Sequence, residues 1–268
     1  MNNRLLHRWF FRIGICAFVM GLAALPCAPS ARAAQSEVPA GIAAVLASPD
    51  RPPADVQRDA LRMPAQTLVF AGAKPGQQIG ELLPGGGYFT RIFSLLVGPQ
   101  GHVYAWVPTL PANAPADAPD FAARVKAIAA DPHFANVSVL AQPINSLQFP
   151  APLDLIWTSQ NYHDFHNIPG GDIGALNKRI FDALKPGGVF LVLDHAAAAG
   201  SGTRDTGTLH RIDPQAVKQE VTAAGFVLEA SSDLLHRPDD THQQNVFDPS
   251  IRGKTDQFIL KFRKPAAK

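Results

Sequence analysis

The chain has 268 residues and a formal net charge of +2. The four charged residues within positions 1–33 are all arginines, so the rest of the chain carries +2 − 4 = −2. This charge gives no reason to expect a nucleic-acid partner, and about 230 residues are enough for one domain with its own core. Both cysteines, Cys16 and Cys27, also fall in residues 1–33, so the rest of the chain has no disulfide or thiol chemistry.

Residues 1–33 have the three parts of a secretory signal peptide. Three arginines precede an apolar stretch at residues 13–25, and Ala31 and Ala33 place small residues at both cleavage positions. The apolar stretch is short for a membrane span. We therefore predict a cleaved signal peptide and a periplasmic or secreted mature protein without a transmembrane anchor.

Residues 34–74 form a segment rich in proline and alanine, in which the pattern predicts two short helices at 55–61 and 64–70. Four charged residues of this segment lie close together, and they admit two interpretations. They form a solvated helix face, or they form a lid over the glycine-rich loop that follows. These residues are Arg51, Arg58, Asp59 and Arg62. We expect an N-terminal helical extension at 34–74 and an α/β domain at 75–268.

Residues 77–90 predict a strand, a tight loop and a helix. An apolar run that carries Glu81 is followed by Gly85, Gly86 and Gly87, and the next apolar residues are spaced three and four apart, on one helical face. Glycine permits the unusual φ of a sharp turn and lets a ligand approach the backbone. In an open α/β sheet such a loop lies at the carboxyl end of its strand, where ligands bind.

Strands and helices alternate through the rest of the chain. Further strands are predicted at 102–107, 136–140, 153–159, 189–194, 226–230 and 257–262, the last of them paired at an edge of the sheet. Helices are predicted at 117–130, at 176–184, and from the capping pair Asp213-Pro214 to Gly225. The alternation predicts an α/β fold with a doubly wound, mostly parallel seven-stranded sheet and helices on both faces.

Three motifs resemble those of class I S-adenosylmethionine-dependent methyltransferases, and within them an exported methyltransferase-like group. They are ELLPGGGYFT at 81–90, LKPGG at 184–188 and AAGF at 223–226, and the likeness extends over roughly residues 40–265. The resemblance implies a Rossmann-like fold and S-adenosylmethionine as cofactor. It also implies methyl transfer to a small or lipid-like acceptor that the sequence does not identify.

The resemblance also implies a cofactor site. Glu81 and the backbone of the glycine loop would face the amino-acid part of the cofactor, whose ammonium and carboxylate suit an acid and bare backbone groups. Trp106 would stack on adenine or would simply pack in the sheet. Val107 stands where the family has an acid for the ribose hydroxyls. The implied cofactor residues are Glu81, Pro84, Gly85, Gly86, Gly87, Tyr88, Trp106 and Asn161.

The candidate catalytic residues follow the fourth and fifth predicted strands. His163 is our first choice as general base, with Asp164 as its orienting group, although both residues could merely cap the following turn. His195 and His210 should reach the same edge of the sheet. These histidines and the nearby aspartates could bind a divalent metal, but their spacing contains no tight ligand motif, so we predict no metal.

Two alternatives to the methyltransferase remain open at this point. One is a binding or scaffold protein that kept the fold without the cofactor, which Val107 and the predicted export favour. The other is a His/Asp-dependent hydrolase at the same sheet edge. The segment 239–242, with two aspartates and a histidine, is either a cover for the site or a plain loop, and nothing in the sequence indicates the oligomeric state.

Overall fold

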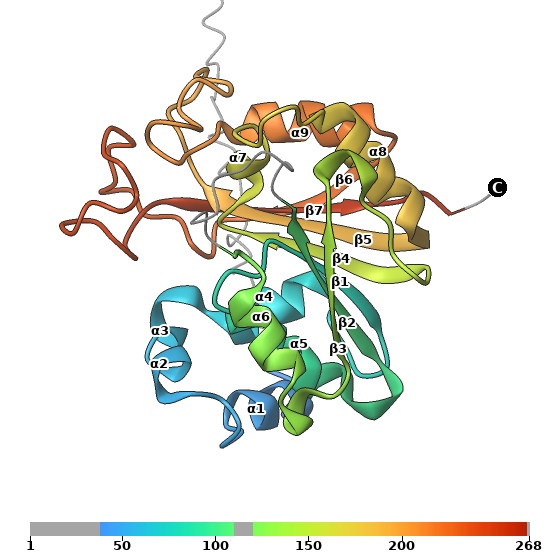
Figure 1. The fold of residues 1–268 in the computed structure, drawn as a ribbon. Coiled ribbons are helices and arrows are strands. Elements are labelled where there is room, and N and C mark those ends of the chain that lie inside the picture. Colours follow the sequence, from blue (N-terminus) through green and yellow to red (C-terminus); the bar gives the residue numbers. More distant parts are fainter. Residues whose placement is uncertain (1–37, 110–119, 267–268) are drawn as a thin grey trace, which may run out of the picture. The chain divides into compact units, whose positions relative to one another are not determined.

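The computed structural model describes residues 38–109 and 120–266. From Val38 on, these residues form one compact unit. Its centre is a seven-stranded sheet in the order β3-β2-β1-β4-β5-β7-β6 (Figure 1). The strands are β1 (Gln78–Leu82), β2 (His102–Pro108), β3 (Val137–Gln142), β4 (Leu153–Ser159), β5 (Leu184–His195), β6 (Val227–Ser232) and β7 (Gln257–Arg263). The predicted signal peptide at 1–33 and the start of the helix predicted at 117–130 lie outside the described residues.

The strand pairing confirms a mostly parallel sheet and corrects one predicted position. The pairs from β3 through β5 are parallel, whereas β7 is antiparallel to both of its neighbours. The sequence pattern predicted β7 at an edge, but β7 lies between β5 and β6. The physical reason is burial: β7 carries buried side chains on both faces, including Ile259 and Leu260, while β6 alternates between exposed and half-buried residues.

Alternate side chains of the central strands enter two separate cores, one on each face of the sheet. In β4, Leu155 and Trp157 belong to one core and Ile156 belongs to the other. This division is the period-2 alternation expected of a strand. Because both faces are covered, these strands have nearly continuous apolar sequences.

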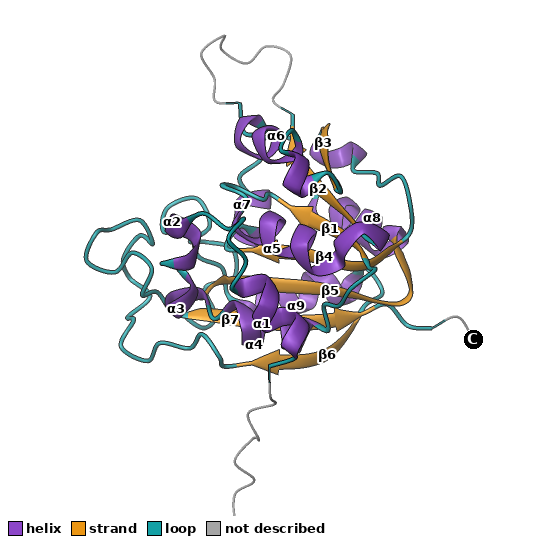
Figure 2. Cartoon of the chain, turned by 90° about the horizontal axis from the view of Figure 1, so that it is seen from below, coloured by secondary structure: helices purple, strands orange, loops and turns teal. Residues whose placement is uncertain are grey.

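The helices fall into two groups that cover the two faces (Figures 1 and 2). Helices α1 (Ala40–Leu46), α4 (Pro64–Ala71), α5 (Tyr88–Val97) and α6 (Ala123–Ala129) supply the core that contains Trp157. Helices α7 (Tyr162–Phe165), α8 (Ile173–Ala183) and α9 (Pro214–Ala223) supply the core that contains Ile156. Asp213 caps α9 as predicted, because its side chain accepts a hydrogen bond from the Gln215 amide at 2.8 Å.

The segment before β1 packs as part of the same unit. It contains α1, α4 and two single-turn helices, α2 (Pro53–Val56) and α3 (Asp59–Arg62), where the sequence predicted two helices in all. Ile42 of α1 and Leu68 of α4 are buried in the core that contains Trp157. Among the helices of the described residues, none is both long enough and apolar enough to cross a membrane.

The LKPGG motif at 184–188 is part of β5, which therefore begins earlier than the strand predicted at 189–194. The pairing with β4 moves from Leu153–Leu184 directly to Leu155–Val189, so residues 185–188 form an irregularity within the strand. Gly187 has φ 78°, which explains why this turn carries glycine.

Candidate functional site

A cavity of about 480 Å³ lies at the carboxyl ends of β1 and β4. These strands are neighbours and parallel, with Leu82 opposite Thr158, so the loops that follow them border one space. The chain order of the sheet reverses between β1 and β4, and this is where open α/β sheets bind ligands. The volume lies in the usual range for small-molecule sites.

The glycine loop forms one wall of the cavity. Gly85 has φ 58° and borders the cavity, and a Cβ added to it would meet no atom within 4 Å. Gly87 has φ 76°, but a Cβ there would lie 2.0 Å from the Ile128 side chain, and Gly87 does not line the cavity. Of the three loop glycines, Gly85 and Gly86 therefore face the cavity, whereas Gly87 allows α6 to pack against the loop. Gly87, which the resemblance places among the cofactor residues, is thus not among the residues that line the cavity.

Glu81 places a carboxylate on the cavity from the interior of the sheet. It is 4% exposed, and the Thr90 hydroxyl donates a hydrogen bond of 2.5 Å to its Oε2. Burial raises the pKa of Glu81 to about 7, although the hydrogen bond from Thr90 and the charge of Arg62 act against the rise. A carboxylate with this pKa gains from a cation placed beside it in the cavity.

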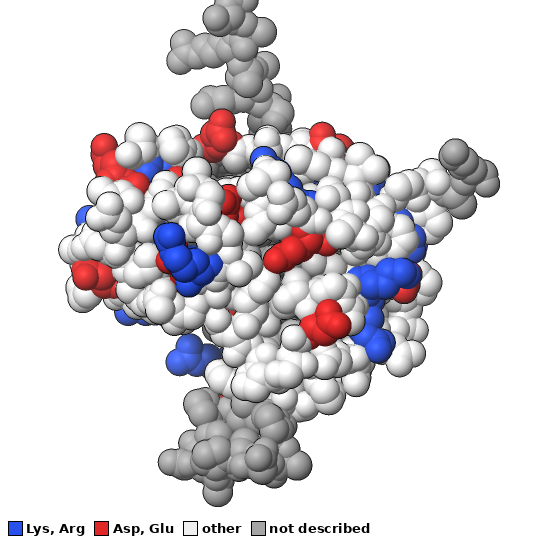
Figure 3. Space-filling model, turned by 90° about the horizontal axis from the view of Figure 1, so that it is seen from above, with Lys and Arg blue, Asp and Glu red and all other residues white. Residues whose placement is uncertain are grey.

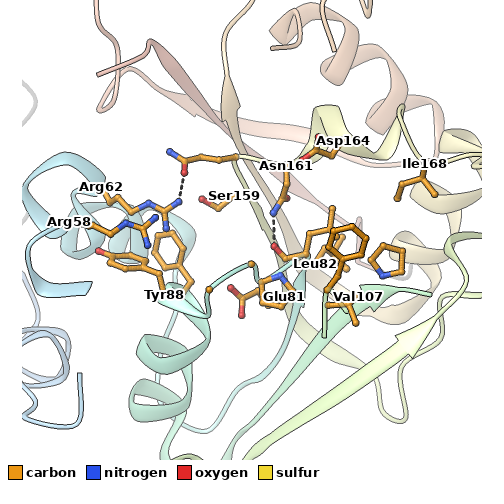
Figure 4. A pocket seen from close by; sticks show the side chains of 18 residues that line it. Arg58, Arg62, Glu81, Leu82, Tyr88, Val107, Ser159, Asn161, Asp164 and Ile168 are labelled. Carbon is orange, nitrogen blue, oxygen red and sulfur yellow. Dashed lines mark hydrogen bonds between the residues drawn. The ribbon is translucent and has the colours of Figure 1, made fainter. Parts of the chain in front are cut away.

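The N-terminal segment contributes two arginines, Arg58 and Arg62, which line the cavity beside Tyr88 (Figure 4). The Arg62 guanidinium lies 4.7 Å from the ring centre of Tyr88, and it donates a hydrogen bond to the side-chain oxygen of Gln160. Burial lowers the pKa of Arg62 to about 10. Of the two interpretations of the charged cluster, a cover over the loop fits these two arginines.

The same segment is fixed to the loop through Tyr88. The Tyr88 hydroxyl donates a hydrogen bond of 2.6 Å to Asp59, and Asp59 in turn pairs with the buried Arg51 at 2.6 Å. Arg51 therefore has a structural partner and does not reach the cavity. The chain Arg51–Asp59–Tyr88 holds α3 against the start of α5.

Asn161 joins the two loops that form the cavity. Its side-chain amide donates a hydrogen bond of 2.6 Å to the carbonyl of Leu83 (Figure 4). Its side-chain oxygen accepts a hydrogen bond from the Thr158 hydroxyl. Leu83 has φ 51°, a conformation that a leucine rarely adopts without support. Asn161 lines the cavity as predicted and also holds the glycine loop against the end of β4.

Next to Asn161, two histidines and two aspartates lie in contact with one another. His163 is 1% exposed, and its Nδ1 lies 2.8 Å from the carboxylate of Asp194 at the end of β5. On the other side, its Nε2 lies 3.3 Å from Oδ1 of Asp164, and the same oxygen lies 3.4 Å from Nδ1 of His210. Of these four residues, Asp164 is the one that lines the cavity.

This arrangement changes the roles that the sequence predicted. Asp194, rather than Asp164, orients His163, because it holds both the backbone amide and Nδ1 of that residue. Burial disfavours the charged imidazole, but the carboxylates of Asp194 and Asp164 outweigh it and raise the pKa of His163 to about 10. A protonated histidine that does not face the cavity is unsuited to be the general base. Asp164 is the group that faces the cavity.

Two other predicted residues do not reach the cavity. Trp106 is fully buried and packs against Phe165, because side chains at alternate positions of β2 point into the core of the second face. His195 is 8% exposed and its Nδ1 pairs with the Thr255 hydroxyl at 2.8 Å. Burial lowers the pKa of His195 to about 4. Trp106 thus packs in the sheet, the alternative that the sequence left open.

Several of the contacts that build the site were not predicted, because their signal is not local. Arg62 and Gln160 are 98 positions apart in sequence and meet only in the folded chain. Asp194 follows an apolar strand, but only the pairing of β4 with β5 brings it to His163. At the end of β2, Val107 and Pro108 give the cavity an apolar wall.

The segment around 239–242 is anchored rather than free. Asp240 forms an ion pair of 2.8 Å with Arg211, whose side chain is fully buried. Arg211 also donates a hydrogen bond to the carbonyl of Ala196. Arg211 therefore has a structural role. On the face drawn in Figure 3, acidic and basic side chains are scattered among neutral ones.

No protein-family profile and no curated protein sequence matches the chain. Solved structures do match it. A SAM dependent methyltransferase from Aquifex aeolicus superposes with a TM-score of 0.53 at 18% identity, over 77% of this chain and 92% of that one. The glycopeptide N-methyltransferase MtfA, complexed with S-adenosylmethionine, gives a TM-score of 0.50 at 14% identity, over 75% of this chain and 86% of that one.

A third similar structure is named as a cyclase and not as a methyltransferase. The 4+2 cyclase SpnF gives a TM-score of 0.57 at 17% identity, over 79% of this chain and 83% of that one. At such low identities the likeness establishes the fold, and the fold by itself leaves the reaction open. The described chain has the Rossmann-like fold of class I S-adenosylmethionine-dependent methyltransferases.

Proposed function

We propose that this protein transfers a methyl group from S-adenosylmethionine to a small or lipid-like acceptor. The observation that carries the proposal is the presence of opposite charges on one cavity, which is lined both by buried Glu81 and by Arg62, beside the open glycine loop. The amino-acid part of S-adenosylmethionine carries an ammonium and a carboxylate, and this cavity offers a partner for each.

The residues on the cavity fit the cofactor in parts. Glu81 would hold the ammonium, and Arg62, whose hydrogen-bond partner in the described ranges is the neutral Gln160, would hold the carboxylate. Gly85 and Gly86 leave their backbone open to the ligand. Val107 and Pro108 supply an apolar wall in place of an acid, so the ribose would be bound without the carboxylate that the family has there.

When bound, the cofactor supplies an activated methyl group, and the chain has to align the acceptor and take up a proton where the acceptor carries one. Asp164 faces the cavity with its side chain 39% exposed. Burial acts to raise its pKa, but His163 and His210 outweigh this and lower the pKa of Asp164. Asp164 is thus an ionised hydrogen-bond acceptor for the acceptor molecule, and His163 is a positioning residue behind it.

The proposal places this activity outside the cytoplasm. Its support is the signal peptide predicted at residues 1–33. Cell fractionation tests this part separately: the proposal expects the processed chain in the periplasmic or culture fraction. Recovery of an unprocessed chain in the cytoplasm would remove the localisation and leave the activity untouched.

Calorimetric titration of the purified protein with S-adenosylmethionine and S-adenosylhomocysteine tests the activity's first requirement. We expect binding of both, weakened by Glu81→Gln through the loss of a charged hydrogen-bond partner worth about 1.5–3 kcal/mol, or roughly 10- to 150-fold in affinity. The matched control is Glu229→Gln, which removes an acid that pairs with Lys261 and Arg263 on the outer strands. No binding heat with folded protein would favour the cofactor-free scaffold instead.

A further inference from the structure

Three potential metal ligands meet beside the cavity. His163, Asp164 and His210 each offer one ligand atom, and these atoms lie within 4.8 Å of one another. Two of the separations are shorter: Oδ1 of Asp164 lies 3.3 Å from Nε2 of His163 and 3.4 Å from Nδ1 of His210. Ligand atoms about 2.0–2.1 Å from a tetrahedral Zn²⁺ are about 3.3 Å apart. The separations of 3.3 and 3.4 Å match this expected distance between two ligand atoms.

Two of these ligand atoms, Nε2 of His163 and Nδ1 of His210, are buried and have no hydrogen-bond partner among the described residues. His163 is almost completely inaccessible at 1% exposure, so an unpaired Nε2 there is costly without a ligand. The adjacent carboxylate does not satisfy either nitrogen with hydrogen-bond geometry. A bound cation that displaces the proton from Nε2 of His163 would contact all three atoms at once.

The surroundings hold these ligands in place. The Nδ1 of His163 is held by Asp194 at 2.8 Å, which is the carboxylate–histidine contact that commonly orients a metal-bound imidazole. His210 has φ 55°, and its ring lies 4.9 Å from that of Phe247. With this backbone conformation, Nδ1 of His210 lies 3.4 Å from Oδ1 of Asp164.

We propose that His163, Asp164 and His210 bind one divalent transition-metal ion. Two imidazole nitrogens and one carboxylate oxygen suit Zn²⁺ and the neighbouring first-row divalent ions. Three protein ligands leave at least one position for water or a substrate oxygen, and Asp164 connects the site to the cavity. The sequence spacing hid this site because His210 reaches the other two residues only through the fold.

The test uses protein produced from the full chain without a histidine tag and stripped with a chelator. Zn²⁺ affinity and stoichiometry are measured by competition with a chromophoric chelator, and bound Co²⁺ by its visible absorption. The variant is His210→Asn, because asparagine tolerates a positive φ. The matched control is His242→Asn, since His242 also has a positive φ, 61°, and also contacts an aspartate, Asp256, at 3.0 Å.

We expect one Zn²⁺ per wild-type chain. The affinity should be at least about 100-fold weaker in His210→Asn, because the loss of a metal ligand should weaken binding at least as much as the loss of a residue that hydrogen-bonds to a ligand. The control should bind as the wild type does. Asp164→Asn provides a second variant if His210→Asn does not fold. Folded wild type that binds no Zn²⁺, or binding that survives in both site variants, would overturn the proposal. This readout is independent of methyl transfer.

Discussion

Replacing Asn161 with alanine should destabilise the fold through the junction of the two loops. The substitution removes the hydrogen bond to the Leu83 carbonyl and the one from Thr158, which is fully buried. Each lost bond of this kind costs about 1–2 kcal/mol, since the partner is left unpaired in the protein. The sum is about 2–4 kcal/mol, or a fall in Tm of about 4–16 °C for a domain of this size.

The matched control for this prediction is Asn145→Ala. Asn145 also makes two hydrogen bonds, donating to Gly170 and accepting from Asp172, but both lie on an exposed surface where water can replace the lost partner. We expect a cost under about 1 kcal/mol there. Urea unfolding of the full chain, followed by circular dichroism, measures both variants. Equal effects of the two substitutions would show that Asn161 does not hold the loops together.

Three further predictions concern the loop, its acid and the anchored segment. Gly87→Ala should cost about 1–3 kcal/mol more in unfolding free energy than Gly85→Ala, because both positions have positive φ and only Gly87 has a side chain in the way; equal costs would contradict this packing role. Because burial raises the pKa of Glu81 to about 7, the contribution of Glu81 to stability is complete below about pH 4.5 and is lost as the pH rises through 7. The unfolding free energy of the wild type relative to Glu81→Gln should therefore fall by on the order of 3 kcal/mol between pH 4.5 and 8. A constant difference would contradict the burial of an ionisable acid. Arg211→Leu should cost about 3–5 kcal/mol in urea unfolding, because it leaves the Asp240 carboxylate buried without its ionic partner. Combining it with Asp240→Asn should recover part of the loss, because the buried charge is removed while a side-chain oxygen remains for a backbone amide. A double variant no more stable than the single one would argue against this account.

Much of the fold was predictable because its signals are local and periodic. The apolar runs of β1, β4 and β5 and the glycine turn at 85–87 were predicted near their observed positions. Parallel pairing followed from the alternation of strands and helices. The prediction that β7 lies at an edge of the sheet was wrong. The position of a short strand in a sheet depends on which strands flank it, and the sequence pattern does not indicate those neighbours.

The site was predicted only where one strand end carries its own signal. Glu81, Asn161 and Asp164, which the sequence named as candidate site residues, line the cavity, and each lies at or next to the end of a central strand. Trp106 was assigned to the site or to the core, and only the orientation of β2 decides between them.

Partnerships between distant segments were not predictable. The sequence indicated His163 but not that Asp194 would hold it, and it indicated Arg62 but not its contact with Gln160. These pairings depend on strand register and on how the N-terminal segment folds back over the loop. Such long-range geometry has no periodic signature in the chain.

A crystal structure of the full chain grown with S-adenosylhomocysteine tests the central claim most directly. The account predicts that the ligand occupies the cavity at the ends of β1 and β4, with its ammonium at Glu81 and its carboxylate at Arg62. A ligand bound elsewhere, or bound in this cavity with the amino-acid part away from Glu81, would contradict it.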